Sequence, residues 1–416
     1  MKAVVLGGGV IGVATAYYLA RDGHEVTVID RNATAASETS HANAGLVTPG
    51  DSYAWASPEA LKIFIRSLYR SDLGIKIRPR LDPALWGWSL RFLAQCTRAR
   101  ARINTLRKLR LTMYSRECMT DLVEHTAVDY DATRQGVLYL FRTQESLDRG
   151  VAHMRLLEDN GLAIEVVNRE RAVAIDAGLS AGAEHIAGAV FSPMDHTGDC
   201  AGFSRALAEW SRREQGVDFA FGTRIDAIEV SGERVVRVVT DRGPMEADVY
   251  VLAAGCDSAS LARPLGVALP IYPVKGYSLT APLRDDAGAP RLGGVDEDKL
   301  VAYSRLGRRL RIAATAEFAG NDRSYRPENF TAMLATVREL FPDAADYDRA
   351  ERWAGLRPMT PTSVPIHGRA RLRNFFVNVG HGHVGWTMAC GSGKLLADLV
   401  AGRAPDIDSE GLLYRN

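Results

Sequence analysis

The stretch KAVVLGGGVIG at residues 2–12 decides the fold, because it joins a short apolar run to three glycines and then to a helical pattern at residues 13–20. A second apolar run follows at residues 26–29 and ends in Asp30. The order strand, glycine turn, helix, strand, acid is the one that a dinucleotide cofactor requires. The glycines let the backbone approach a pyrophosphate, the helix start stabilises its charge, and the acid receives a ribose hydroxyl. The stretch therefore predicts a Rossmann-like domain.

Length and composition limit the remaining possibilities. A chain of 416 residues is long for a single core, so two domains are expected. The balance of 51 basic against 50 acidic residues excludes a globally basic nucleic-acid binder. The five cysteines are scattered and contain no Cys-x-x-Cys pair, which predicts no disulfide framework, no metal site and a reducing cytoplasm. Neither a signal peptide nor a membrane-spanning apolar run is expected.

Residues 53–125 differ in character and are expected to be mainly helical. Residues 60–68 are apolar with helical spacing. An aromatic and aliphatic set comes next, made up of Trp86, Trp88, Leu90, Phe92 and Leu93. A basic run follows, made up of Arg98, Arg100, Arg102, Arg107, Lys108 and Arg110. This composition suits a peripheral membrane contact through residues 86–110, and it suits equally a helix pair with a solvated basic side.

The rest of the chain alternates strand and helix signals. Strands are expected at 137–141, 164–167, 186–191, 247–255 and 375–379, a meander at 217–230 and 235–240, and an antiparallel sheet across 270–317. Helices are expected at 146–158, 200–215, 328–340 and 390–400. Arg357 lies in an apolar, proline-bounded segment, where a buried cation is costly unless an anion meets it.

Several of these stretches, taken in chain order, resemble the motifs of a known protein family. The stretches are VLGGGVIG (5–12), ETSHANAG (38–45), TGDC (197–200), YPVKGYS (272–278), GLRP (355–358), GHG (380–382) and GWTMACGSG (385–393). Together they resemble the flavoprotein family of D-amino acid oxidases, glycine oxidases and sarcosine oxidases. The resemblance spans the whole chain, which makes it more specific than the first motif alone.

The resemblance implies FAD as the cofactor, and it implies which residues hold it. The adenosine and pyrophosphate end would meet the first glycine motif and Asp30, and residues 42–46 would lie along the isoalloxazine ring. The implied cofactor-binding residues are Gly7, Gly9, Val10, Ile11, Gly12, Asp30, Arg31, Ser40, Asn43, Ala44, Gly45, Leu46, Ala253, Gly255, Gly380, His381, Gly382, Gly385, Trp386 and Thr387. Some relatives attach FAD to a histidine, but His41 lies one residue too early for that pattern, so non-covalent FAD is expected.

The resemblance also implies a substrate site. Arg357 resembles the arginine that pairs with a substrate carboxylate, and a planar guanidinium fixes orientation as well as charge. No tyrosine stands at the usual place for a second contact, so Tyr53, Tyr277 and Tyr303 are the candidates. His383 stands where some relatives carry a second arginine, and it is a further candidate site residue that could shape the pocket or tune the flavin.

The implied activity is FAD-dependent oxidative deamination of D-amino acids to 2-oxo acids and ammonia, with hydride transfer from Cα to flavin N5 and electrons passed to a quinone or another non-oxygen acceptor. Three alternatives remain open: a dehydrogenase of D-proline or another cyclic amine, an oxidase that forms hydrogen peroxide, and a flavin-bearing subunit without turnover. The expected location is cytoplasmic or peripheral on the inner face of the cell membrane.

The implied fold is α/β, with a Rossmann-like, glutathione-reductase-like FAD-binding domain and a second α+β substrate domain on a mostly antiparallel sheet. The expected FAD-binding domain is discontinuous and comprises residues 1–50, 197–268 and 350–416. The expected substrate domain comprises residues 51–196 and 269–349.

Overall fold

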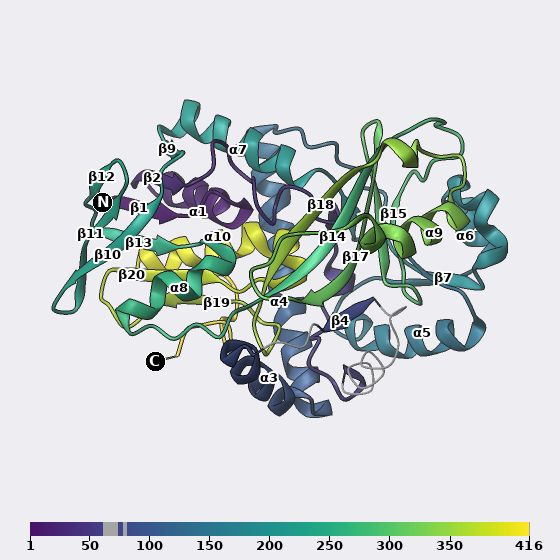
Figure 1. Ribbon diagram of the computed structural model, residues 1–416, viewed down its shortest axis with the longest axis horizontal. Coiled ribbons are helices and arrows are strands. Elements are labelled where there is room, and N and C mark those ends of the chain that lie inside the picture. Colours follow the sequence, from purple (N-terminus) through teal and green to yellow (C-terminus); the bar gives the residue numbers. More distant parts are fainter. Residues whose placement is uncertain (61–73, 78–80, 416) are drawn as a thin grey trace.

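The structure, a computed structural model, describes residues 1–60, 74–77 and 81–415. The helix expected at residues 60–68 lies almost entirely outside the described residues. In Figure 1 the described chain forms two halves, with a parallel sheet on the left and a mostly antiparallel sheet on the right. This arrangement confirms the expected fold class.

The parallel sheet is built around β1 (Lys2–Leu6), which lies between β2 (Glu25–Asp30) and β13 (Val249–Leu252). The sheet continues through β20 (Phe375–Val379) to the antiparallel edge strand β19 (Ile366–Arg369) on one side, and to β9 (Asp218–Phe221) on the other. Apolar residues occupy both faces of β1, as expected for a strand covered on both sides.

The two faces of this sheet have different covers. Ala3 and Val5 share a core with helices α1 (Val10–Arg21), α7 (Cys200–Gln215) and α10 (Gly385–Val400). Val4 and Leu6 share a core with the three-stranded meander of β10 (Ile225–Ser231), β11 (Arg234–Thr240) and β12 (Gly243–Met245). Because strand side chains alternate, one short strand anchors both layers.

Two sequence-based boundaries need correction here. Residues 218–221, expected in the meander, instead form β9 and extend the parallel sheet beside β2. The chain reaches β9 through α7, so β2 and β9 follow the usual parallel crossover rather than a hairpin. Helix α10 begins at Gly385 rather than at residue 390, because the glycine-rich turn before it is already helical at its end.

The second sheet has the strand order β18-β14-β17-β16-β15-β5-β7-β6, with β4 (Ile75–Ile77) beside β17. Its longest strands are β14 (Tyr272–Pro282), β17 (Arg309–Phe318) and the edge strand β18 (Glu351–Met359). The remaining strands are β15 (Gly293–Asp296), β16 (Val301–Leu306), β5 (Val137–Phe141), β7 (Gly188–Ser192) and β6 (Glu165–Asn168). Helices α5 (Gln144–Glu158), α6 (Arg169–Ile175) and α9 (Thr331–Leu340) lie beside this sheet (Figure 1).

Helices α3 (Pro83–Gln95) and α4 (Arg98–Thr126) lie in the stretch expected to be helical. Helix α4 falls within the residues predicted for the substrate domain, yet it packs along α10 and adds Cys118, Met119 and Leu122 to the core around α1. The domain boundaries given above therefore stay predictions. We propose that α4 belongs structurally to the nucleotide-binding half.

Candidate cofactor and substrate site

A cavity of about 1140 Å³ runs between the two halves of the described chain. The carboxyl ends of β1, β2, β13 and β20 open into one end of it, through Gly7, Asp30, Ala253 and Gly380. Strands β14, β17 and β18 wall the other end. Ligands of open α/β sheets bind beyond the carboxyl ends of the strands, so the position fits a cofactor that spans both halves.

The glycine turn after β1 brings the first helix close to the sheet. Gly7 has a φ of +119°, and a Cβ there would lie 2.5 Å from the Ala253 carbonyl oxygen. A Cβ at Gly12 would lie 1.8 Å from the Gly7 carbonyl oxygen. The N-cap residue Gly9 carries no capping side chain, so the start of α1 faces the cavity with backbone alone. Such a helix start is a ready site for a phosphate group.

Asp30 ends β2 beside this turn. Its carboxylate accepts hydrogen bonds from the backbone N–H of Gly8 at 2.7 Å and of Asn32 at 2.8 Å, and it lines the cavity. Arg31 also lines the cavity and pairs with Glu38 and Asp257, each at 2.8 Å. The acid and its neighbour thus sit where an adenosine ribose would lie beside a pyrophosphate.

Residues 40–46 form the next part of the wall. Ser40 accepts a hydrogen bond from the Val10 N–H at 3.1 Å, which ties this loop to the start of α1. The Asn43 carbonyl accepts one from the Arg311 guanidinium at 2.9 Å, which ties it to β17. Ala44 and Leu46 line the cavity; Gly45 does not, because it turns toward Ser304 at a φ of +72°.

His41 lies outside the cavity lining. Its ring packs on Trp353 with centroids 4.6 Å apart, and one ring nitrogen lies 3.5 Å from Arg205. Burial lowers the pKa of His41. The position supports the expectation of a non-covalent cofactor.

The turn between β20 and α10 supplies the opposite wall. Gly380, His381, Gly382, Gly385 and Trp386 all line the cavity. Gly380 has a φ of +80°, and a Cβ there would lie 2.5 Å from the Thr360 side chain. His381 is buried and contacts the Ser392 hydroxyl at 3.1 Å, and burial holds its pKa well below the usual value.

Thr387 is not brought to the cavity, because its hydroxyl accepts a hydrogen bond from the Thr48 N–H at 3.0 Å. Gly12 also lies behind the cavity wall, in contact with Gly7.

Two buried polar atoms at this wall test whether a flavin nucleotide fits. The Trp386 indole N–H and the Asn378 side-chain oxygen are buried and have no hydrogen-bond partner within the described residues, and both residues line the cavity. Buried polar groups are nearly always paired, so a polar ligand is expected there. The bare helix start, the ribose acid and these atoms together fit FAD.

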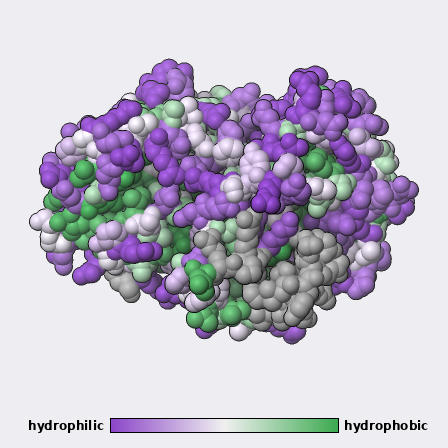
Figure 2. Space-filling model, viewed as in Figure 1, coloured by the Kyte–Doolittle hydropathy of each residue, from purple (hydrophilic) through white to green (hydrophobic). Residues whose placement is uncertain are grey.

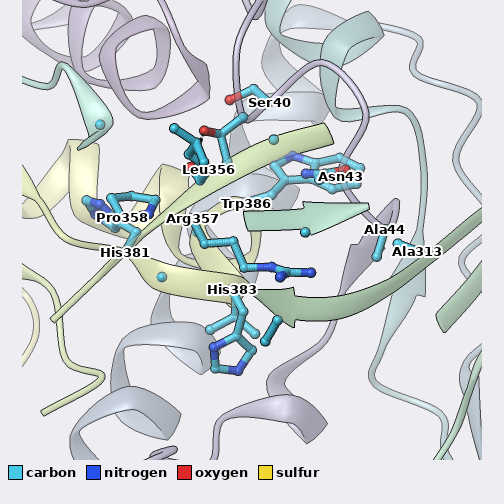
Figure 3. A pocket seen from close by; sticks show the side chains of 18 of the residues that line it. Ser40, Asn43, Ala44, Ala313, Leu356, Arg357, Pro358, His381, His383 and Trp386 are labelled. Atoms are coloured by element: carbon cyan, nitrogen blue, oxygen red, sulfur yellow. Dashed lines mark hydrogen bonds between the residues drawn. The ribbon is translucent and has the colours of Figure 1, made fainter. Parts of the chain in front are cut away.

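Arg357 projects from β18 into the other end of the cavity (Figure 3). Its guanidinium donates a hydrogen bond to the Thr315 carbonyl at 2.7 Å, and Thr315 holds an unusual φ of +69°. No carboxylate lies within ion-pair distance of Arg357 in the described residues. Burial lowers the pKa of Arg357 to about 10, and only Asp51 opposes that shift. A buried cation of this kind is completed by an anionic ligand.

Gly276 makes room for that side chain. A Cβ at Gly276 would lie 2.5 Å from the Arg357 guanidinium. Any other residue at position 276 would therefore displace the Arg357 side chain. Gly276 pairs with Gly355 across β14 and β18, two positions along the strands from the pair of Val274 and Arg357. The sequence-based prediction included Arg357 but not Gly276, although the glycine lies inside one of the motifs quoted above.

The structure places the three candidate tyrosines differently. Tyr53 lines the cavity, and its ring stacks on His153 with centroids 3.8 Å apart. Tyr277 also lines the cavity, and its hydroxyl donates to Glu317. Tyr303 does not line the cavity: strand alternation turns Ala302 toward it, while the Tyr303 ring packs on Phe341. Of the three, Tyr53 and Tyr277 therefore remain candidates for contact with a ligand.

A cluster of ionisable groups that the sequence did not reveal surrounds His383. The His383 ring stacks on Trp55, and its Nε2 lies 3.8 Å from the Asp51 carboxylate and 3.5 Å from the Lys108 ammonium. Lys108 donates to the Tyr53 carbonyl at 2.6 Å and is fully buried, so it does not belong to a solvated basic face.

The two outer members of this cluster have shifted pKa values. Burial raises the pKa of the Asp51 carboxyl to about 6 and lowers that of the Lys108 ammonium to about 7, and each opposes the shift of the other. His383 is held neutral, because burial and the neighbouring Lys108 and Arg357 cations lower its pKa. Burial thus favours the uncharged form of both groups, and the attraction between their charged forms opposes it.

Asp195 lies just behind this cluster and yields a stability prediction. It is 1% exposed and accepts hydrogen bonds from the Tyr139 hydroxyl at 2.7 Å and the Gly50 N–H at 3.1 Å. Burial raises its pKa from 3.8 to about 7. The folded state therefore binds more protons than the unfolded chain between these values, so the free energy of unfolding falls as pH rises through this interval.

We expect Asp195→Asn to raise the free energy of unfolding by about 1–3 kcal/mol at pH 8. The amide keeps an acceptor for Gly50 and removes the buried charge. The gain should disappear at about pH 3, where the carboxyl is mostly protonated in both states. Urea unfolding of both proteins at the two pH values measures it, with Asp218→Asn, an exposed acid, as the control. An equal effect at both pH values would contradict the assignment.

Comparison with known proteins gives consistent results. The family model described as FAD dependent oxidoreductase matches residues 2–399. D-amino acid dehydrogenase 2 of Mesorhizobium japonicum is 55% identical over 414 residues, with full coverage of both chains. D-amino acid dehydrogenase of Paramagnetospirillum magneticum is 46% identical and covers 99% of this chain and 98% of its own.

Solved structures with a similar fold include glycine oxidase from Geobacillus kaustophilus, with a TM-score of 0.77, 22% identity, and coverage of 100% of this chain and 99% of that one. L-proline dehydrogenase from P. horikoshii has a TM-score of 0.73 at 18% identity, with coverage of 98% and 95%. These two likenesses concern the fold.

Proposed function

Because the chain belongs to the FAD dependent oxidoreductase family, we propose that it catalyses the oxidative deamination of D-amino acids and passes the electrons to an acceptor other than oxygen. The observation that supports an amino acid as the substrate is Arg357, a buried cation at the cavity wall without a carboxylate partner in the described chain. An amino-acid carboxylate supplies the missing charge. D-configuration rests on the names of the two dehydrogenase relatives.

The residues that would hold FAD divide into three groups. The start of α1, with Gly7 and Gly9, would take the pyrophosphate, and Asp30 would take the adenosine ribose. Residues 43–46 would lie along the ring system, and the turn at residues 380–386 would meet its polar edge. The unpartnered Trp386 N–H supports the last placement.

FAD, when bound, would supply the hydride acceptor, and the residues of this chain would orient the substrate Cα for that transfer. Arg357 would hold the carboxylate, and the Thr315 carbonyl would hold Arg357 in place. The substrate amine must be neutral when the hydride leaves, so a proton must be held elsewhere. Asp51 and Lys108, which flank His383 and whose pKa values burial shifts toward the uncharged forms, are the groups placed to hold it.

An anaerobic flavin-bleaching screen tests this proposal. The purified holoenzyme is mixed with D- and L-amino acids, including both prolines, and flavin reduction is followed by absorbance. We expect D-amino acids to bleach the flavin and acid precipitation to release the flavin from the protein. Bleaching by L-amino acids alone would contradict the proposed stereochemistry. Bleaching by D-proline alone would favour the cyclic-amine alternative.

The electron acceptor is part of the same proposal. We propose that the acceptor is a quinone. The rate of turnover with a soluble quinone analogue should exceed the rate of hydrogen peroxide formation in air. Rapid peroxide formation would instead identify an oxidase.

An exposed apolar patch on α3 bears on how such an acceptor is reached. Trp86, Leu90 and Leu93 share one face of α3 and are 53%, 70% and 45% exposed. Apolar atoms gather at the lower edge of Figure 2, where α3 lies in Figure 1. Arg91, Arg98, Arg100 and Arg102 are exposed nearby, whereas Trp88 is buried against Phe92 and Phe318. The described helices include none long and apolar enough to cross a bilayer.

We propose that this patch touches the surface of an anionic membrane. The full-length protein should cosediment with anionic vesicles at low salt and be released at high salt. A Trp86→Ser, Leu90→Ser double variant should bind the vesicles at least tenfold more weakly than the wild type. The control Leu300→Ser, which changes an exposed apolar residue elsewhere, should bind them as the wild type does. Equal binding of the wild type and the double variant would rule out α3 as the contact.

A further inference from the structure

Three consecutive acids, of which Asp296 is the last residue of β15, lie beside the cavity, and two of them already have partners. Asp296 is fully buried and pairs with Arg142 at 2.8 Å. Asp298 accepts hydrogen bonds from the Arg142 N–H and the Ser146 hydroxyl, both at 2.7 Å. Glu297, between them, lines the cavity, and its carboxylate has no hydrogen bond or ion pair within the described residues.

The position of Glu297 along the cavity follows from its neighbours. Tyr53 and Val295, the latter two residues before Glu297, pack against the same apolar cluster, and all three residues line the cavity. The Tyr53 carbonyl binds Lys108, which lies 3.5 Å from His383. Figure 3 shows His383 next to Arg357, and Arg357 lowers the pKa of His383. A ligand whose carboxylate meets Arg357 would therefore direct its far end along Tyr53 toward Glu297.

Among the residues that the structure describes, no cation forms an ion pair with Glu297. Its nearest charged neighbours are other acids, and burial together with these acids raises the pKa of Glu297 to about 8. Arg149 lines the cavity but pairs with Glu145, and Lys108 is held by the Tyr53 carbonyl. His153, stacked on Tyr53, has a pKa lowered by burial. A carboxylate in such a place is stabilised by a cation brought in by the ligand.

We propose that Glu297 is a specificity-determining residue that binds the cationic side chain of a basic D-amino acid such as D-arginine or D-lysine. The inference rests on the proposed function, because it takes the α-carboxylate to lie at Arg357. The stacked rings of Tyr53 and His153 form an aromatic wall for the stem and cation of such a side chain.

Steady-state kinetics of the holoenzyme with side chains of matched length test the proposal. We expect kcat/KM for D-arginine and D-lysine to exceed those for D-norleucine and, more strongly, D-glutamate. In Glu297→Gln, KM for D-arginine should rise about 30-fold or more, the lower end for truncation of a buried charge pair. The KM for D-norleucine should change by less than about threefold. Glu297→Asp, which keeps the negative charge, should retain part of the preference for D-arginine over D-norleucine.

Glu59→Gln is the matched control, because Glu59 is an exposed carboxylate at the rim of the same cavity. It should leave the ratio of D-arginine to D-norleucine unchanged. An equal loss in both glutamine variants would show a general charge effect, and an equal loss for both substrates in Glu297→Gln would show a structural role. Either result, or a wild type without preference for cationic side chains, would overturn the proposal.

Binding measured by equilibrium dialysis separates this inference from the proposed function. If no D-amino acid bleaches the flavin, the proposed function fails, and the dialysis of labelled D-arginine against the wild type and Glu297→Gln still decides the role of Glu297. Weaker binding to the variant would support it, and equal binding would refute it.

Discussion

Replacing Arg357 by alanine is expected to raise KM for D-amino acids by about 30- to 4000-fold, which corresponds to the 2–5 kcal/mol typical of a truncated buried charge pair. The reason is geometric and electrostatic: the guanidinium is buried at the cavity wall and has no competing carboxylate partner in the described chain. Arg357→Lys should recover part of the loss, since it restores the charge but not two parallel hydrogen bonds. Steady-state kinetics with one good substrate measure both.

The thermal midpoint of the Arg357→Ala apoprotein should not fall, because burial already disfavours the cation when no ligand is bound. Its FAD content should also stay that of the wild type. Arg323→Ala is the control, because Arg323 lines the cavity but is half exposed and paired with Glu38. An unchanged KM in Arg357→Ala would remove Arg357 from the substrate site.

Replacing Gly12 by alanine should cost the protein its cofactor. The new Cβ would lie 1.8 Å from the Gly7 carbonyl oxygen, a backbone atom that cannot rotate away, so α1 must move off β1. Overpacking of this kind costs about 1–3 kcal/mol or more, and here it displaces the helix start that would meet the pyrophosphate. We expect an FAD-to-protein ratio below one tenth of the wild-type value and a lower thermal midpoint of the apoprotein.

Gly9→Ala and Gly87→Ala separate the two effects. A Cβ at Gly9 meets only the Ser40 hydroxyl oxygen at 3.5 Å, so the apoprotein should fold normally while FAD binds more weakly at the crowded helix start. Gly87, inside α3, has open space around it, and alanine there should be neutral or slightly stabilising. Wild-type FAD content in Gly12→Ala would contradict the close approach of α1 to β1.

The sequence predicted the cofactor-binding half well because its signals are local. A strand, glycine turn and helix are encoded within residues 2–21, and the acid that ends β2 follows a few residues later. The helix at Cys200–Gln215 was likewise predicted to the residue, since Asp199 is its N-cap and Gly216 its left-handed C-cap.

The substrate end could not be predicted to the same depth, because its groups meet only in three dimensions. Lys108 belongs by sequence to a basic run, and its burial depends on α4 packing against distant elements. Asp51 and Glu297 carry no local pattern that distinguishes them from surface acids, and Tyr303 resembles a site residue until its strand is seen to turn it away. Strand β9 shows the same limit, because pairing with β2 depends on the sheet and not on its own residues.

The packing of α1 against α10 has a consequence for biosynthesis. Helix α1, which begins at Val10, packs against helix α10, which ends at Val400. Strand β20, which pairs with β13 in the parallel sheet, ends only at residue 379. During translation the glycine turn therefore emerges long before the elements that close it, and contacts of such high sequence separation form slowly. Nascent chains therefore lack the part of the cover on α1 that α10 provides until this last helix leaves the ribosome. Cofactor loading is consequently expected as an event after chain release, and chains that stop before residue 385 should be unable to retain FAD.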